Sequence, residues 1–304
     1  MRGRLAAAAL GLALCAGCGP VREASNTVTT ADYTLGERTA GASRPPPAHP
    51  LRVMSTNQCV DLLVLQMLPK DRIVSVSYLA RDVADDIRPG LADGVATNRA
   101  QAEDIVAYRP DLLLVSVYTS PVLRRTAARA GVPMVEVDDA ITFDDIRRVT
   151  RQVGAAVGEP ARAEALLSEM DATLTELRRA PPQRKVSVVA WNGGLSVPGR
   201  SSLANTIIEE AGGTNIAARD GFTQSSFGLE ELASLRPDAL LYGEGQATRP
   251  SLRNDQATHR LVRRLYEGRR IRYPEVMFGC GLPQAAGMAA DLRAAFAQLP
   301  EGRS

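Results

Sequence analysis

Two segments of the sequence repeat one pattern, and this internal repeat is the feature that most restricts the possible fold. Residues 103–114 read EDIVAYRPDLLL and residues 230–241 read EELASLRPDALL. In both copies a short helical stretch begins with an acid and ends at Arg-Pro, because proline disfavours helical geometry in the residue before it. An apolar run of strand length follows. The copies are separated by roughly half of the predicted folded region, so the repeat predicts two similar lobes rather than a solenoid.

Short apolar, β-branched runs alternate with longer amphipathic stretches along the whole chain. Strands separated by helices form parallel sheets with covered faces. The sequence therefore predicts an α/β protein with two Rossmann-like lobes, built on mostly parallel sheets and joined by a single long α-helix. The predicted strands are 51–55, 72–77, 111–116 and 133–137, then 185–191, 238–242 and 270–273, and the clearest helices are 60–68, 122–130, 203–211 and 285–299.

The joining helix is predicted between the two copies of the repeat. Thr142 and Asp145 have the spacing of a capping box, and Gly158 is placed to end the helix that follows. Pro160 suits the first turn of a second helix that runs to about residue 179. About 20 residues at ~1.5 Å per residue make a rod of about 30 Å, which is long enough to bridge two lobes. We predict an N-terminal lobe at 49–141, a helical connector at 142–181 and a C-terminal lobe at 182–304.

The N-terminus has the pattern of an export signal. Residues 1–18 contain two arginines, an apolar run and small residues before Cys18, which predicts a signal peptide with a lipobox and a lipid on Cys18. Cys15 occupies a position where the lipobox usually has Leu, and cleavage to a soluble protein is the alternative. Residues 19–48 are poor in bulky apolar side chains and predict a flexible tether. We expect contact with a membrane through the N-terminal lipid only.

Composition excludes several classes of partner and site. Lys and Arg total 36 against 34 Asp and Glu, and no basic run appears, so nucleic acid is not an expected partner. Only His49 and His259 are present, whereas capture of a bare transition-metal ion usually gathers several His and carboxylate ligands. We therefore predict no metal site and no cofactor of the protein's own.

These motifs together resemble a known family. The segments 55–61 (STNQCVD), 72–77 (RIVSVS) and 279–283 (GCGLP), with the two repeat copies, resemble the helix-bridged substrate-binding proteins of ABC importers, which include cobalamin-, ferric siderophore- and haem-binding proteins. The resemblance implies a monomeric solute-binding lipoprotein, anchored by lipid at the periplasmic or extracytoplasmic face. It also implies delivery of a ligand to a permease dimer with ATPase subunits.

In this family one glutamate on each lobe docks onto the permease, and the resemblance assigns that role to Glu103 and Glu230. An acid in the first turn of a helix also gains from the helix dipole without binding anything, so a purely local role is the alternative. Two acids at equivalent positions of two lobes suit a two-fold partner.

The ligand is expected between the lobes, beyond the carboxyl ends of the strands. A flat, partly apolar metal chelate suits the aromatic residues that follow predicted strands. We slightly favour a corrinoid, because Arg81 is the one clear cleft arginine for an anionic ferric siderophore; haem with a tyrosine ligand is a further alternative. The predicted ligand-binding residues are Asn57, Cys59, Tyr78, Arg81, Tyr118, Trp191, Asn192, Tyr242, Phe278 and Cys280.

Cys59 and Cys280 leave three interpretations open: a disulfide between the lobes, two thiols that face the ligand, or two buried cysteines without a role. Two other classes of function also compete. A cysteine-dependent enzyme needs a histidine base, and His259 lies on a predicted surface helix far from either thiol. A non-transport surface lipoprotein predicts no ligand and no role for Glu103 or Glu230. We expect no enzymatic activity.

Overall fold

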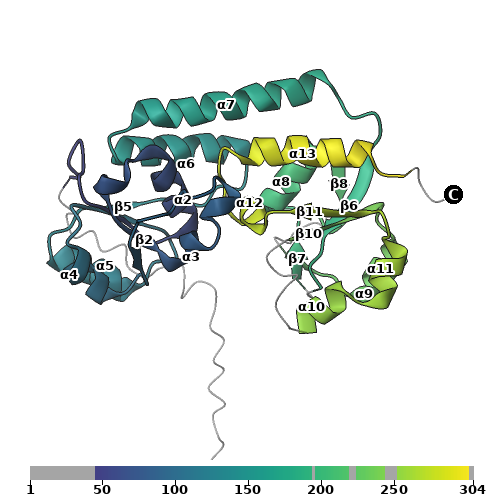
Figure 1. Cartoon of the computed structure of the whole chain (residues 1–304), viewed down its shortest axis with the longest axis horizontal. Helices are drawn as coiled ribbons and strands as arrows, with labels where there is room; N and C mark the ends of the chain where they lie inside the picture. Colours follow the sequence, from purple (N-terminus) through teal and green to yellow (C-terminus); the bar gives the residue numbers. More distant parts are fainter. Residues whose placement is uncertain (1–44, 194–195, 219–223, 244–251, 301–304) are drawn as a thin grey trace, which may run out of the picture. The chain divides into compact units, whose positions relative to one another are not determined.

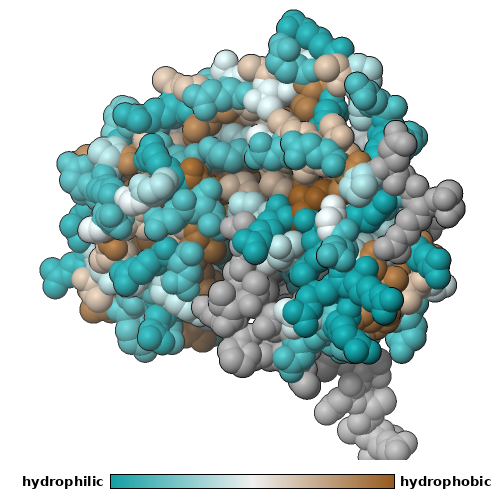
Figure 2. Space-filling view, turned by 45° about the vertical axis from the view of Figure 1, so that its right-hand side comes forward, coloured by the Kyte–Doolittle hydropathy of each residue, from teal (hydrophilic) through white to brown (hydrophobic). Residues whose placement is uncertain are grey.

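The computed structural model describes residues 45–193, 196–218, 224–243 and 252–300, which form two parallel-sheet lobes (Figure 1). The predicted signal peptide, Cys18 and most of the tether lie outside the described residues. Polar side chains cover most of the face shown in Figure 2, with apolar side chains exposed in separate patches. None of the described helices combines the length and the apolar character that crossing a bilayer requires.

The N-terminal lobe is a five-stranded sheet in the order β3-β2-β1-β4-β5, with every neighbouring pair parallel. The predicted strands are confirmed within one or two residues, and the two-residue β3 was not predicted because it is too short to show a period. The strands are β1 (Val53–Ser55), β2 (Ile73–Ser77), β3 (Thr97–Asn98), β4 (Leu112–Val115) and β5 (Met134–Glu136). The helices are α2 (Gln58–Met67), α3 (Tyr78–Arg81), α4 (Ala102–Tyr108) and α5 (Pro121–Arg129), with short 3-10 turns at Lys70–Arg72 and Ala84–Asp86.

The C-terminal lobe is a four-stranded parallel sheet in the order β11-β10-β6-β8, with a separate antiparallel pair β7-β9. The strands are β6 (Val186–Ala190), β7 (Ser196–Pro198), β8 (Gly213–Asn215), β9 (Gln224–Ser226), β10 (Ala239–Gly243) and β11 (Arg270–Tyr273). The helices are α8 (Leu203–Glu210), α9 (Leu229–Leu235), α10 (Leu252–Ala257), α11 (Arg260–Leu265), α12 (Glu275–Gly279) and α13 (Ala285–Ala297).

The two lobes share one arrangement, as the sequence repeat predicts. Across the first sheet the order β2-β1-β4-β5 matches, strand for strand, the order β8-β6-β10-β11 across the second sheet. The two repeat copies form the equivalent units α4-β4 and α9-β10. Arg109 and Arg236 end their helices in the left-handed region, with φ of 45° and 43°. This conformation costs a non-glycine residue about 1–2 kcal/mol, yet it occurs at the same position in both lobes.

The aspartates that follow the two Arg-Pro pairs also have equivalent roles. The Asp111 carboxylate accepts hydrogen bonds from the backbone N–H groups of Leu51 and Arg52, both at 2.9 Å, just before β1. The Asp238 carboxylate accepts from the N–H and hydroxyl of Ser187 in β6, at 2.8 and 2.7 Å. Each Arg-Pro-Asp segment therefore ends a helix and fixes the neighbouring strand in its sheet.

The connector consists of α6 (Phe143–Ala156) and the 20-residue α7 (Pro160–Arg179). The predicted capping box of α6 is confirmed, with reciprocal hydrogen bonds of 3.1 Å between Thr142 and Asp145. Gly158 ends this segment at φ 75°, where a Cβ atom would lie 2.4 Å from the Ala48 carbonyl oxygen. The predicted long helix is also confirmed, and in Figure 1 α7 runs beside α6 and α13.

One arginine from each lobe holds one end of α7. Arg72 of the N-terminal lobe pairs with Glu159 at 2.6 Å, at the start of the helix. Arg293 of α13 donates to the carbonyl oxygens of Leu177 and Ala180 at its end, and to those of Glu210 and Ala211 at the end of α8. The long helix is therefore attached to both lobes by side chains as well as by the chain itself.

Candidate functional site

The predicted ligand-binding residues follow the carboxyl ends of neighbouring parallel strands. Asn57, Tyr78 and Tyr118 follow β1, β2 and β4, which are adjacent in the first sheet. Asn192 follows β6 in the second sheet, Tyr242 lies at the end of β10, and the segment with Phe278 and Cys280 follows β11. Since the carboxyl ends of parallel strands meet at one edge, each lobe gathers its candidates along a single sheet edge.

A disulfide joins these two edges. Cys59, in the first turn of α2 after β1, is bonded to Cys280 after α12, with their Cα atoms 5.0 Å apart. The first of the three interpretations is therefore the one observed, and the two residues do not present free thiols to a ligand. The bond also shows that the sheet edges of the two lobes face each other at this point. Contact of either cysteine residue with a ligand stays a prediction.

Large apolar side chains are exposed along the edge of the N-terminal lobe. Tyr78 and Leu79 after β2 are 53% and 45% exposed, and Val117 and Tyr118 after β4 are 55% and 76% exposed. Most residues of this size lie in the core of a folded domain, so exposed apolar side chains that cluster at one edge are candidates for contact with a ligand. Leu79 is a neighbour of Tyr78 and was also a candidate from the sequence, and Val117 adds to the predicted set.

Polar groups flank these side chains. The Tyr118 hydroxyl donates to the Asp139 carboxylate at 2.9 Å, and this hydrogen bond raises the pKa of Tyr118. The Arg99 guanidinium lies 5.9 Å from the centre of the Tyr78 ring, within cation–π range. Arg81 is exposed at the end of α3. Arg99 was not predicted, because the strand that it follows, β3, is too short to be recognised in the sequence.

Asn57 is in part a structural residue. Its side-chain oxygen accepts from the N–H groups of Cys59 and Val60 at 3.0 and 3.3 Å and thereby caps α2. Its amide nitrogen donates to Ser116 at 3.3 Å. Asn57 therefore links the segment after β1 to the end of β4 and orders the edge of the N-terminal lobe.

A tyrosine and two arginines lie together on β10 and the outermost strand β11 of the C-terminal sheet. The Arg272 Nε atom donates to the Tyr242 hydroxyl at 2.6 Å, and the Arg270 guanidinium lies 4.4 Å from the centre of the Tyr242 ring. Tyr242 and Arg272 are register partners on β10 and β11. Neither arginine was predicted as a site residue, because the sequence indicates only that both lie in a strand. The register of that strand against β10 brings them beside Tyr242.

The remaining C-terminal candidates differ in their surroundings. Asn192 is half-buried, and its side-chain oxygen accepts from the Gly243 N–H at 2.7 Å. Phe278 is half-buried and stacks on Tyr273 with ring centres 4.0 Å apart. The prediction for Trp191 is wrong: its side chain is only 1% exposed, and its Nε1–H donates to the Phe227 carbonyl oxygen at 3.0 Å. Trp191 belongs to the core of this lobe, where it clusters with Val189, Phe227 and Leu240.

The two glutamates with the predicted docking role occupy equivalent, exposed positions. Each is the second residue of its helix, Glu103 in α4 and Glu230 in α9. The next acid provides the local cap: Asp104 accepts from the Gln101 N–H at 2.9 Å, and Glu231 accepts from the Gly228 N–H at 2.6 Å. No salt bridge joins either glutamate to a residue within the described ranges.

Asp61 carries a buried carboxyl group beside the carboxyl end of β2, in the N-terminal lobe. It is fully buried in α2, and one oxygen accepts from the N–H and hydroxyl of Ser77, at 3.0 and 2.5 Å. Its other oxygen has no hydrogen-bond partner within the described part of the chain. Burial raises the pKa of Asp61 from 3.8 to about 7, against the opposing effect of the serine hydrogen bonds.

Replacement of Asp61 by Asn is expected to remove a pH dependence of stability. The unfolded chain releases this proton near pH 4 and the folded protein near pH 7, so the stabilising effect is complete below pH 4 and is lost as the pH rises through 7. Over this window the free energy of unfolding of the wild type should fall by about 4 kcal/mol relative to Asp61→Asn. Urea denaturation of both proteins from pH 4 to 8 measures this difference, and parallel curves would contradict it.

The fold is that of a two-lobed, helix-bridged class of protein, in which the carboxyl edges of two parallel sheets face each other. Comparison with protein families matches residues 53–264 to the family Periplasmic binding protein. This match covers more than half of the 304 residues, and the chain therefore belongs to the periplasmic binding protein family. The resemblance seen in the sequence is confirmed.

Individual relatives are more distant. The Bacillus subtilis protein "Uncharacterized ABC transporter substrate-binding lipoprotein YvrC" is 22% identical over 162 residues, which cover 50% of this chain and 51% of that protein. The chain thus matches about half of that relative's length. The apo structure of the periplasmic heme-binding protein RhuT from Roseiflexus sp. RS-1 is similar with a TM-score of 0.66 and 22% identity, over 81% of this chain and 97% of that one. The periplasmic vitamin B12 binding protein BtuF of Vibrio cholerae has a TM-score of 0.59 and 15% identity, over 82% and 97%. At such identities these structures establish the fold alone.

Proposed function

We propose that the protein is an extracytoplasmic substrate-binding lipoprotein of an ABC importer, which holds a chelated-metal ligand between its lobes and delivers it to a permease dimer. The observation that carries this proposal is the pair Glu103 and Glu230. Both carboxylates are exposed at equivalent positions of the two lobes, and neighbouring acids already serve the helix caps. The pair therefore suits complementary positive groups on a two-fold partner.

The lipid anchor is part of this proposal. Cys18 is the proposed lipidated residue, which places the protein at the periplasmic or extracytoplasmic face of a membrane. The description of YvrC as a lipoprotein supports this assignment. The mass of the mature N-terminal peptide tests it directly: a lipid-modified Cys18 is expected, and an unmodified N-terminus after cleavage would favour the soluble alternative.

The proposed ligand class is supported by residues of the two lobes. An aromatic ring with an adjacent guanidinium lies on each edge, Tyr78 with Arg99 and Tyr242 with Arg272. Arginine recognises carboxylates and other anionic oxygens strongly because its planar group donates paired hydrogen bonds. The aromatic argument for a corrinoid also weakens, since Trp191 is buried. We therefore favour an anionic chelate, haem or a ferric siderophore, over the corrinoid that the sequence slightly favoured. RhuT binds heme and BtuF binds vitamin B12 on the same fold, so the fold alone does not choose between them.

Native mass spectrometry with an absorption spectrum, on protein purified from its own cells without reduction, tests the proposal. A coloured adduct of one ligand per chain is expected. A corrinoid adduct would agree with the proposed transport function but would overturn the proposed preference for an anionic chelate. A protein that binds none of hemin, ferric siderophores and cobalamin would favour the non-transport lipoprotein. The alternative of a cysteine-dependent enzyme loses its nucleophile, because Cys59 and Cys280 are joined.

Replacement of Arg272 by Gln is expected to weaken hemin binding about tenfold, because a charged hydrogen bond contributes roughly 1.5–3 kcal/mol. The Tyr242 hydroxyl would lose its hydrogen bond from the Arg272 guanidinium, while Arg270 would stay beside the ring. Fluorescence titration with hemin measures the change. The matched control is Arg125→Gln, which removes an exposed arginine on α5 and should leave affinity unchanged. Equal hemin affinities for the two variants would show that Arg272 does not contribute to hemin binding.

A further inference from the structure

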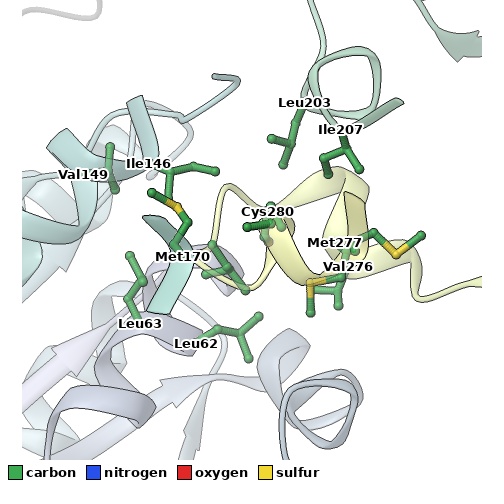
Figure 3. Close-up of a cluster of buried hydrophobic side chains, with 14 of the residues drawn as sticks. Leu62, Leu63, Ile146, Val149, Met170, Leu203, Ile207, Val276, Met277 and Cys280 are labelled. Carbon is green, nitrogen blue, oxygen red and sulfur yellow. The ribbon is translucent and has the colours of Figure 1, made fainter. Parts of the chain in front are cut away.

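The two lobes are in contact where α2 meets the segment between α12 and α13, and we call this contact region the seam. The Cys59–Cys280 disulfide lies in the seam. The bond joins residues 221 positions apart in the chain, one in each lobe. Cys280 is only 3% exposed, and Cys59 packs against the same core. Figure 3 shows Cys280 among apolar side chains of both lobes and of the connector, including Leu62 of α2, Ile207 of α8 and Met277 of α12. The disulfide therefore lies at the border of the core, with Cys280 buried and Cys59 half-buried.

A second contact joins the same two segments. Gln66, seven residues after Cys59 and thus about two helical turns along α2, accepts a hydrogen bond of 2.6 Å from the side-chain nitrogen of Gln284. Gln284 immediately precedes α13. Helix α2 is thus attached to the C-terminal lobe at two points along one face. Two separated points restrict rotation of α2 about the disulfide.

The seam continues toward the connector through close backbone contacts. At Gly281 a Cβ atom would lie 2.4 Å from the Ala140 Cβ and 2.5 Å from its carbonyl oxygen, so only glycine allows this approach. The Thr206 hydroxyl of α8 donates to the Ile141 carbonyl oxygen at 2.7 Å. Segments from both lobes therefore pack directly on each other where the first lobe ends.

The lobes consequently have two covalent connections. The first is the connector, whose long helix α7 is held by Arg72 at its start and by Arg293 at its end. The second is the disulfide between α2 and the end of α12. A single bridge leaves the lobes free to twist or rock about it, whereas a second bridge at a different place restricts both movements.

We infer that the Cys59–Cys280 disulfide is a covalent clasp that fixes the spacing of the two lobes. The noncovalent contacts of the seam position the lobes, and the clasp limits the range over which they separate. The effect of the clasp on the spacing of the two lobes does not depend on a ligand. The further consequence, that the clasp slows escape of a bound chelate, rests on the proposed function.

Distance measurements between the lobes test the clasp. Spectroscopic labels that do not react with thiols are introduced at Val106 and Leu235, which are 68% and 47% exposed on α4 and α9. In the full-length protein the distance distribution should be narrow. In the double variant Cys59→Ala/Cys280→Ala it should become at least twice as broad, while hydrogen exchange in the strands of each lobe stays unchanged. An equally narrow distribution in the double variant would overturn the inference.

Two further measurements separate the possible causes. The double variant Gln66→Ala/Gln284→Ala removes the second contact and keeps the clasp, so its distribution should stay narrower than that of the cysteine variant. If the cysteine variant does not fold, reduction of the folded, labelled wild type with a trialkylphosphine takes its place, with the same expected broadening. Hemin dissociation from the unlabelled proteins is expected to be about tenfold faster without the clasp. Absence of hemin binding in the wild type would contradict the proposed ligand but leave the distance test intact.

Discussion

Replacing both Glu103 and Glu230 by alanine is expected to abolish ligand uptake by cells while leaving ligand binding to the purified protein unchanged. The two carboxylates are exposed on α4 and α9, and neither belongs to the predicted ligand-binding set. Loss of one charge from a complementary contact costs roughly 2 kcal/mol, or about thirtyfold in affinity for the permease. Because the two sites lie on different lobes, their effects should add, to about a thousandfold.

The control is a second pair of exposed glutamates. Glu169→Ala/Glu209→Ala removes the same charge from α7 and α8, where neither residue forms a salt bridge with a described residue. Uptake by this variant should equal that of the wild type. Single replacements of Glu103 and Glu230 should each give intermediate uptake. Normal uptake by the Glu103/Glu230 double variant would exclude the docking role, and lost ligand binding would show that the substitutions act on the fold instead.

Removal of the disulfide should lower the stability of the protein substantially. Joining residues 221 positions apart restricts the unfolded chain, and loop entropy predicts a stabilisation of at most about 5 kcal/mol, with about 2–4 kcal/mol being typical. For Cys59→Ala/Cys280→Ala we therefore expect the unfolding midpoint to fall by roughly 5–15 °C. Because alanine leaves no thiol in the buried position of Cys280, the comparison avoids an unpaired polar group in the core.

Thermal unfolding of both proteins with and without a trialkylphosphine completes this test. Reduction should lower the midpoint of the wild type toward that of the double variant and leave the variant itself unchanged. The difference between the two proteins should therefore disappear in the reducing buffer. Equal midpoints in the oxidising buffer would show that the seam is held by its noncovalent contacts alone.

Much of the fold was predictable because its signals are local. The capping box of Thr142 and Asp145, the first-turn position of Pro160 and the Arg-Pro ends of the repeat copies each depend on residues within a few positions. Such contacts form in the same way wherever the segment lies. The strands predicted from apolar runs were therefore found within one or two residues, and the repeat led to two lobes with the same strand order.

The candidate site was predictable only in outline. Strand ends indicated where it lies, because parallel strands bring their carboxyl ends to one edge. They did not distinguish Tyr118, which is 76% exposed, from Trp191, which is 1% exposed, although both follow a strand closely. The direction of each ring depends on the packing beneath its sheet edge. Arg99 and Arg272 were missed for a similar reason, since each gains its tyrosine neighbour from an adjacent strand.

The sequence by itself therefore determined the α/β class, the two equivalent lobes, the bridging helix and the resemblance to the family. Tertiary structure alone decided that Cys59 is bonded to Cys280, that the Tyr242 ring lies beside Arg270 and Arg272, and that Asp61 is a buried acid with a raised pKa. The physical reason is the range of the interactions. Helix caps and strand patterns arise between near neighbours in the chain, whereas these contacts join residues between 16 and 221 positions apart and exist only once the chain has folded.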